Sequence, residues 1–232
     1  MKHINPFLEA VIHDMGLKPD SIPVMAHEEI LASQRRLLAE HPPLTIAPAP
    51  SVPQKFRAVR FAETKPRPEV KGYATAAKAT KKWVRQVAGG EAPLLALVGP
   101  KGTSKTHLAC CAAWALHEEH GIHVPFYSWY ELVDWLRAGR FVTTEHGTRE
   151  LPPSHVRQHV YDTRMCIVDE ARPTSGTDFD ATELAKLSLQ RYDSERALLL
   201  TCNSSSLDAL MGAPAADRFA IAIMDGPSYR ST

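Results

Sequence analysis

One stretch of the chain constrains its fold more than any other, the segment LLALVGPKGTSKTHLA from Leu94 to Ala109. An apolar run of strand length comes first, a glycine-containing turn follows, and Lys105-Thr106 opens a segment with helical periodicity. A strand, such a turn and a helix in this order direct backbone N–H groups and a helix N-terminus at one point, where they attract phosphate. The stretch therefore predicts a phosphate-binding loop.

The turn departs at one position from the pattern G-x-x-x-x-G-K-[ST]. Its eight residues are Gly99, Pro100, Lys101, Gly102, Thr103, Ser104, Lys105 and Thr106. We expect Lys105 to reach the β- and γ-phosphates and Thr106 to ligate Mg²⁺. Ser104 stands where the pattern has glycine, so its β-carbon can weaken binding, or its hydroxyl can donate to a phosphate oxygen. The alternative is a strand–turn–helix connection that binds no phosphate and contains a lysine by chance.

Polar residues end two further apolar strands. MCIVDEA carries Asp169 and Glu170 at its end, and LLLTCN carries Thr201 and Asn203. Because ligands of open parallel sheets bind at the carboxyl edge, we expect these side chains to face the same site. Asp169 would hold Mg²⁺ through water, Glu170 would polarise the attacking water, and Asn203 would orient it. Each residue also has an explanation without a function: the two acids can simply be solvated at the end of a strand, and the asparagine can cap a turn.

Strand-like and helix-like segments alternate after Phe56. Strands are expected within 92–99, 122–129, 163–170, 196–203 and 218–226, and helices within 72–90, 105–121, 130–139 and 181–195. This alternation predicts an α/β domain whose parallel sheet is covered on both faces. Pro125 indicates an edge position or a distortion for the second strand. Residues 143–160, which include Arg149 and Arg157, are expected to form a loop.

The N-terminal part differs in composition from the rest. Residues 1–40 contain short helical patterns that are too small to enclose a core, so they should pack on a partner or on the main body. Residues 41–55 carry five prolines and are expected to form an extended linker. A third zone runs from residue 56 to residue 232.

Charge and cysteine content bound the remaining possibilities. The net charge is +1, so contact with nucleic acid requires a local basic patch. The four cysteines form no CxxC pair, which indicates free thiols in a reducing compartment. We see no signal peptide and no run approaching a membrane span, and we therefore expect a cytoplasmic protein without a membrane partner.

Five segments, in this order, carry a resemblance to a known family: GPKGTSKTHLA, MCIVDEA, QRYDSERALLLTCNSSSLDALMG, ADRFA and DGPSYRST. From Phe56 to Thr232 the chain resembles the bacterial and phage DnaC/DnaI-type helicase loaders, AAA+ ATPases of the IstB-like ATP-binding group. The resemblance implies a P-loop NTPase core with a parallel five-stranded sheet flanked by helices, a reduced or absent lid, and a small helical N-terminal region. It also implies ATP and Mg²⁺ as cofactors.

The resemblance assigns roles by position. Three motifs match residues already described: Lys105 and Thr106 in Walker A, Asp169 and Glu170 in Walker B, and Asn203 at sensor 1. Arg218 in ADRFA matches the arginine finger that such proteins present to the nucleotide of a neighbouring subunit. Arg230 lies in the SYR segment and is a candidate for nucleotide sensing or DNA contact. Pro214 stands where these loaders often carry a second arginine.

The activity that the resemblance implies is ATP-dependent loading of a replicative DNA helicase during replication initiation. Residues 1–40 would bind the helicase, 41–55 would link, and 56–232 would form the ATPase domain. Copies of that domain would assemble through their AAA+ interfaces around single-stranded DNA, with 143–160 as a candidate DNA contact. Two alternatives stay open: an IstB-type transposition helper ATPase that acts on duplex DNA, and a helicase-binding adaptor that does not hydrolyse ATP.

Overall fold

The computed structural model describes residues 50–144, 147–172, 178–204 and 207–228. The predicted helical region 1–40, most of the predicted linker, and Arg230 lie outside these residues.

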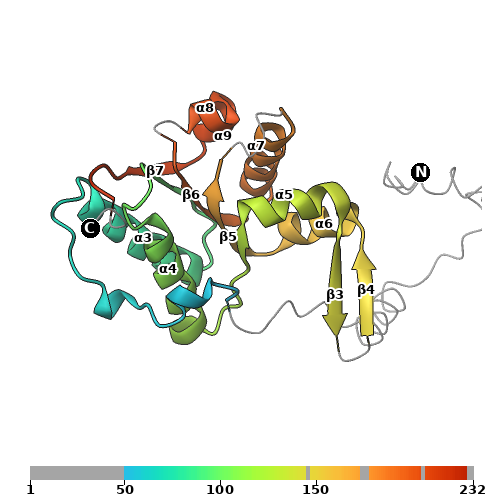
Figure 1. The fold of residues 1–232 in the computed structure, drawn as a ribbon, viewed down its shortest axis with the longest axis horizontal. Coiled ribbons are helices and arrows are strands. Elements are labelled where there is room, and N and C mark those ends of the chain that lie inside the picture. The colour runs from blue at the N-terminus through green and yellow to red at the C-terminus, as the bar shows by residue number, and fades with distance from the viewer. Residues whose placement is uncertain (1–49, 145–146, 173–177, 205–206, 229–232) are drawn as a thin grey trace, which may run out of the picture. The chain divides into compact units, whose positions relative to one another are not determined.

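Five parallel strands form the central sheet, in the order β2-β5-β6-β1-β7 (Figure 1). Their bounds are β1 (Leu94–Val98), β2 (Phe126–Ser128), β5 (Met165–Ala171), β6 (Ala197–Cys202) and β7 (Ala220–Ile223). All five strands lie where the apolar runs predict them. The strand β2 begins directly after Pro125 and lies at an edge of the sheet, as the proline indicated.

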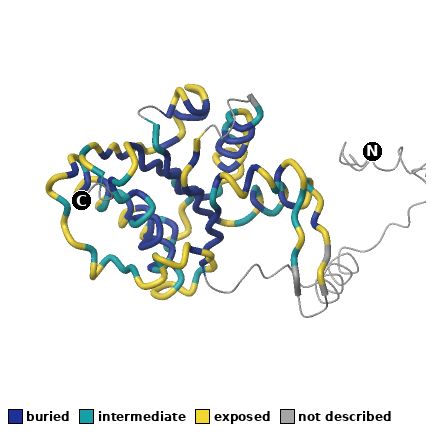
Figure 2. The backbone as a smooth tube through the Cα atoms, in the orientation of Figure 1, coloured by how far each residue is buried: buried dark blue, intermediate teal, exposed yellow. Residues whose placement is uncertain are grey.

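The sheet brings three strand ends together. In register, Val98 of β1 pairs with Cys202 of β6, and Val168 of β5 pairs with Leu200 of β6. The strands β1 and β6 are buried along their whole length, because helices cover both faces (Figure 2). The carboxyl ends of β1, β5 and β6 therefore form one continuous edge.

Helices pack on both faces of this sheet. The described helices are η2 (Gln54–Phe56), η3 (Phe61–Glu63), α3 (Tyr73–Ala88), α4 (Lys105–His120), α5 (Trp129–Ala138), α6 (Pro153–Asp162), α7 (Asp178–Asp193), α8 (Asp208–Met211) and α9 (Ala213–Ala216). The helices α3 and α4 lie together on one face, and α5 and α7 lie on the other (Figure 1). Within the part described, no helix follows β7.

The main core lies between the sheet and the pair α3 and α4. Trp83 of α3 and Leu108 of α4 are buried against Leu97 and Leu199 of the sheet. The Trp83 ring nitrogen also donates to the carbonyl of Pro93 at 2.9 Å, which fixes α3 to the start of β1. Burial of a large side chain contributes about 1.5–3 kcal/mol, so this face holds the phosphate loop on a rigid base.

The expectation that residues 143–160 form a loop is wrong. An antiparallel hairpin of β3 (Arg140–Thr144) and β4 (Gly147–Leu151) begins this region, and α6 completes it. The helix starts at a proline, which suits a first helical turn, and it buries Val156 and Val160 four residues apart. Arg157 forms an ion pair with Glu183 of α7 at 3.1 Å, which makes it part of the helix packing.

A buried arginine, Arg191, connects α6, α7 and β6. Arg191 of α7 is fully buried, and its guanidinium donates to the carbonyls of Val160 (2.6 Å), Thr163 (3.0 Å) and Ala197 (2.6 Å). Two of these carbonyls close the end of α6, and the third begins β6. Because all three are backbone acceptors, one side chain fixes α6, α7 and β6 together.

Two further expectations concerned the state of the cysteines and the presence of a membrane-spanning segment. All four cysteines are buried and free, as their sequence context indicated. Within the described ranges, no helix combines the length and the apolar character needed to cross a membrane.

Candidate functional site

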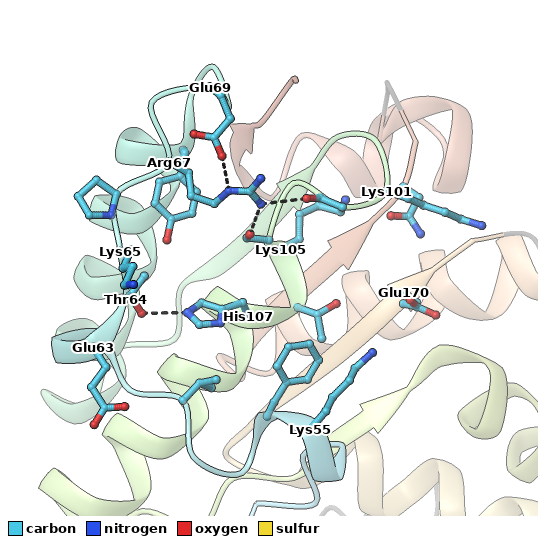
Figure 3. Close-up of a pocket in the computed structure, with 18 residues that line it drawn as sticks. Lys55, Glu63, Thr64, Lys65, Arg67, Glu69, Lys101, Lys105, His107 and Glu170 are labelled. Carbon is cyan, nitrogen blue, oxygen red and sulfur yellow. Dashed lines mark hydrogen bonds and ion pairs between the residues drawn. The ribbon is translucent and has the colours of Figure 1, made fainter. Parts of the chain in front are cut away.

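A pocket of about 690 Å³ opens at the carboxyl ends of β1, β5 and β6 (Figure 3). The phosphate loop, the two strand ends and the segment between η2 and α3 line it. The lining residues that bear on function are Phe56, Val59, Thr64, Arg67, Tyr73, Lys101, Gly102, Ser104, Lys105, Thr106, His107, Glu170 and Asn203. Sequence-predicted residues from three separate segments thus meet at one cavity.

Two glycines let the loop pack closely against the end of the chain. Gly99 has φ +147° and Gly102 has φ +83°, both in the region that favours glycine. A β-carbon at Gly99 would collide with the carbonyl of Met224, and one at Gly102 would collide with Ser228. The segment after β7 therefore supports the phosphate loop from behind.

Ser104 occupies the position where the motif has glycine, in the left-handed conformation (φ +75°, ψ +21°). A serine can adopt this backbone at a cost of about 1–2 kcal/mol. Its hydroxyl accepts a hydrogen bond from Nη1 of Arg67 at 2.7 Å. The loop thus keeps the glycine-type conformation in spite of the serine.

Lys105 is buried within its own loop. Its ammonium donates to the carbonyls of Gly99 (2.8 Å) and Pro100 (2.6 Å), and Thr103 Oγ1 lies 3.4 Å away. Burial lowers the pKa of Lys105 to about 8, although neighbouring groups, including Asp169, oppose the shift. A cation held by carbonyl and hydroxyl oxygens can exchange them for the oxygens of an anion.

Thr106 and Asp169 lie in direct contact. Thr106 Oγ1 donates to Asp169 Oδ1 at 2.9 Å, and Thr201 Oγ1 donates to the same oxygen at 2.5 Å. Burial raises the pKa of Asp169, while the two hydroxyl donors counteract part of that rise. A cation bound nearby would therefore stabilise the ionised form of the Asp169 carboxylate.

Glu170 sits on a bulge at the end of β5. The register of β5 with β6 shifts between Val168 and Ala171, and Glu170 has φ +58°. Its backbone N–H donates to Thr201 Oγ1 at 3.0 Å, and its exposed side chain lines the pocket. Bulges redirect a side chain, and left-handed backbone at a residue other than glycine concentrates at functional sites.

Of the other two predicted catalytic residues, Asn203 lies at the pocket and Arg218 does not. Asn203 follows β6, is partly buried and lines the same pocket as Glu170. Arg218 is exposed, lies outside the pocket lining, and places its guanidinium 4.6 Å from the centre of the Tyr192 ring. Arg218 therefore does not reach the pocket of its own chain.

Several lining residues were not singled out from the sequence. Thr64 Oγ1 donates to the carbonyl of Arg60 at 2.8 Å and lies 2.9 Å from His107 Nε2, so it accepts a hydrogen bond from that ring nitrogen. Burial and the charge of Arg67 lower the pKa of His107. Arg67 and Thr64 carry no motif signature, because their roles depend on contacts between distant segments.

The oxygen donors at the phosphate end fit Mg²⁺. Thr106 offers a hydroxyl and Asp169 a carboxylate, which are the hard oxygen ligands that this ion prefers together with water and phosphate. In the ranges that the structure covers, no group of three His, Cys, Asp or Glu side chains could hold a metal on its own. An ion held by Thr106 and Asp169 would take its remaining ligands from water and phosphate.

Comparisons with known proteins bear on the family and the fold of the chain. The model of the family described as IstB-like ATP binding protein matches residues 50–225. A search of curated protein sequences finds no match.

Solved structures share the fold at low sequence identity. The DnaC helicase loader has a TM-score of 0.60 at 17% identity, covering 74% of this chain and 99% of that one. DnaI has a TM-score of 0.59 at 12% identity, with coverages of 76% and 96%. DnaA from Aquifex aeolicus bound to AMPPCP has a TM-score of 0.55 at 15% identity, with coverages of 75% and 51%. These matches confirm the predicted AAA+ P-loop fold.

Proposed function

The chain belongs to the IstB-like ATP-binding protein family, and from this premise we propose that it is a Mg²⁺-dependent ATPase that loads a replicative DNA helicase. One observation carries the proposal of ATPase chemistry. Lys105 and Thr106 lie at the same pocket as Glu170 and Asn203, and Thr106 contacts Asp169. Phosphoryl transfer to water requires a phosphate-binding cation, metal ligands and a water-polarising group, and these five residues can supply them.

We assign the two ends of the pocket to the two ends of ATP. The triphosphate would lie at Lys105 and Thr106, where the N-terminus of α4 points into the pocket. The base would lie toward Phe56, Val59 and Tyr73, which offer the apolar lining typical of small-molecule sites. A volume of about 690 Å³ falls within the range for such ligands.

Each residue at the phosphate end has one role in the proposed reaction. Lys105 would exchange the carbonyls of Gly99 and Pro100 for phosphate oxygens and neutralise charge there. Thr106 and Asp169 would hold Mg²⁺, which supplies charge neutralisation on the phosphates when bound.

The two remaining residues would act on the attacking water. Glu170 would accept its proton, and Asn203 would orient it toward the γ-phosphate. Thr201 would fix the Glu170 backbone and the Asp169 carboxylate together, because its hydroxyl contacts both.

Arg218 would act on a neighbouring copy of the chain. It is exposed and outside its own pocket, which suits a side chain that completes a site in trans. An arginine stays charged at all physiological pH values and can stabilise charge on the γ-phosphate. We therefore propose self-assembly in which Arg218 of one copy faces the nucleotide of the next.

The partners follow from the proposed loader function. Residues 1–40 would bind the helicase, 41–55 would link, and 56–232 would hydrolyse ATP beside single-stranded DNA. The fold shared with DnaC and DnaI supports this choice. Co-purification of a replicative helicase with the full chain, and its loss on deletion of residues 1–40, would test the partner.

A second candidate is an IstB-type transposition helper that acts on duplex DNA, and the family match favours it. A transposase recovered in place of a helicase, together with ATPase stimulation by duplex DNA, would select the helper. A helicase-binding chain without turnover, measured with helicase and single-stranded DNA present, would instead indicate an adaptor.

The test of the ATPase proposal combines three variants. Lys105→Ala should abolish ATP binding, because it removes the cation of the phosphate loop. Glu170→Gln should retain binding and lower turnover by about 10²–10⁴-fold, the usual contribution of general acid–base catalysis. Lys82→Ala removes an exposed charge on α3 and serves as the control with unchanged binding and turnover. Equal ATP affinity in the wild type and in folded Lys105→Ala would refute the proposal.

A further inference from the structure

The serine of the phosphate loop has a partner from a distant part of the chain. Arg67 lies between η3 and α3, and Nη1 of its guanidinium donates to Ser104 Oγ (2.7 Å) and to the Gly102 carbonyl (3.0 Å). Its Nε donates to Glu69 Oε1 at 2.7 Å. Figure 3 shows Arg67 extended from its own segment toward the loop that carries Lys105. The Arg67 side chain is only 12% exposed, and its bonds to Ser104 and Gly102 are partly buried, whereas Glu69 is exposed.

The position of the Ser104 hydroxyl is unusual for a residue at the start of a helix. Ser104 is the residue that precedes α4, where serine commonly accepts a hydrogen bond from the first-turn N–H groups. Here its side chain makes no such bond to α4 and faces Arg67 instead. Those first-turn N–H groups are the donors that a phosphate at a helix N-terminus requires.

Arg67 also holds the tip of the loop. Gly102 accepts from Arg67 through its carbonyl, and its α-carbon packs against Ser228 so closely that a β-carbon would collide there. The tip is thus fixed from two sides by segments that are far apart in the sequence. Ser104 keeps its left-handed backbone next to this fixed point.

We propose that Arg67 is a positioning residue of the nucleotide site, paired with Ser104 in place of the glycine that the motif normally has. Resting on the proposed ATP binding, this role is to hold the serine hydroxyl away from the start of α4 and to keep the loop open for phosphate. Arg67 acts chiefly through Ser104, so most of its effect on ATP affinity depends on the Ser104 hydroxyl, and its bond to the Gly102 carbonyl accounts for the small remainder.

A double-mutant cycle tests this dependence. The four proteins are wild type, Arg67→Ala, Ser104→Ala and the double variant, each as the full chain, titrated with AMPPCP and Mg²⁺ by calorimetry. Ser104→Ala removes the hydroxyl and keeps the β-carbon. We expect Arg67→Ala to weaken binding about tenfold in the wild-type background and at most about twofold in the Ser104→Ala background.

A direct contact between Arg67 and the nucleotide would give a different pattern. Arg67→Ala would then weaken binding equally in both backgrounds, and the proposal would be overturned. No effect in either background overturns it as well. Glu69→Gln separates loss of the Arg67–Glu69 ion pair from loss of the Ser104 contact, and it should bind as the wild type does. Arg57→Ala removes an exposed arginine outside the pocket lining and controls for charge alone.

A second measurement distinguishes failure of this pairing from failure of the proposed function. If the folded wild type does not bind AMPPCP, the ATPase proposal fails, and the pair is judged by urea unfolding of the same four proteins. Arg67→Ala should then lower the unfolding midpoint more in the wild-type background than in the Ser104→Ala background. Equal decreases would show that the two side chains are not coupled, and the pairing would be rejected.

Discussion

Replacing Thr201 with valine removes one hydroxyl that joins both acids of the site. Thr201 is 1% exposed, donates to Asp169 Oδ1 at 2.5 Å and accepts from the Glu170 N–H at 3.0 Å. Valine has nearly the same shape, so packing changes little. A hydrogen bond to a charged group contributes about 1.5–3 kcal/mol and a neutral one about 0.5–1.5 kcal/mol. We therefore expect Thr201→Val to lower the free energy of unfolding by about 2–4 kcal/mol when Asp169 is ionised.

The pH dependence of this loss follows from Asp169. Burial raises its pKa in the folded state above the ordinary value for an aspartate, so the folded state binds more protons than the unfolded state between those two pKa values. Stability consequently falls as pH rises through that window. Thr201→Val removes a donor to the carboxylate, which raises the folded pKa further and deepens the fall. The deficit relative to wild type should be small near about pH 4 and complete above the window.

Urea unfolding followed by tryptophan fluorescence measures this deficit, because Trp83 and Trp129 are fully buried. Thr80→Val is the matched control: Thr80 is also buried, but its hydroxyl donates only to the Ala76 carbonyl of its own helix. We expect the control to lose about 1 kcal/mol or less, at every pH. Equal losses in the two variants, or a Thr201→Val loss that does not change with pH, would refute the assigned contacts.

Three further predictions concern single residues. The pKa of Lys105 is about 8 in the free protein, and a bound triphosphate favours the charged form of this side chain. ATP affinity should therefore fall as pH rises above 8, by up to about tenfold per pH unit. A constant affinity from about pH 7 to about pH 9, measured by calorimetry, would contradict this. Arg218→Ala should leave ATP affinity unchanged and lower the turnover of the assembled protein by about 10³-fold or more, and full activity in a steady-state phosphate-release assay would exclude a role in trans. Arg191→Met removes the donor to four backbone carbonyls, those of Val160, Tyr161, Thr163 and Ala197, and should cost about 3–5 kcal/mol in urea unfolding. A loss below about 1 kcal/mol would show that water replaces the guanidinium.

The strands β1, β5 and β6 could be predicted from the sequence because each is a short apolar run that is almost wholly buried, whereas the apolar edge strand β7 is largely exposed. Leu94–Val98 and Ala197–Cys202 contain no charged residue, and the polar residues that follow them mark the edge where the site forms. The phosphate loop was equally accessible, since its residues are contiguous. Local patterns therefore identify Lys105, Thr106, Asp169 and Asn203 as neighbours once a parallel sheet is assumed.

Some features depend on contacts that no local pattern reports. The region 143–160 was expected to be a loop. The burial of Val156 and Val160 and the Arg157–Glu183 ion pair, which support α6, become visible only in the folded chain. Arg67 is similar, because its contact with Ser104 joins residues 37 positions apart.

The most direct measurement of nucleotide binding at this site is a crystal structure of the full chain grown with AMPPCP and Mg²⁺. We expect the triphosphate to lie across the start of α4, with the Lys105 ammonium moved from the Gly99 and Pro100 carbonyls to phosphate oxygens and Mg²⁺ beside Thr106 and Asp169. A nucleotide bound elsewhere, or a phosphate loop that the Ser104 side chain closes while Lys105 keeps its carbonyl contacts, would contradict the proposed ATPase site.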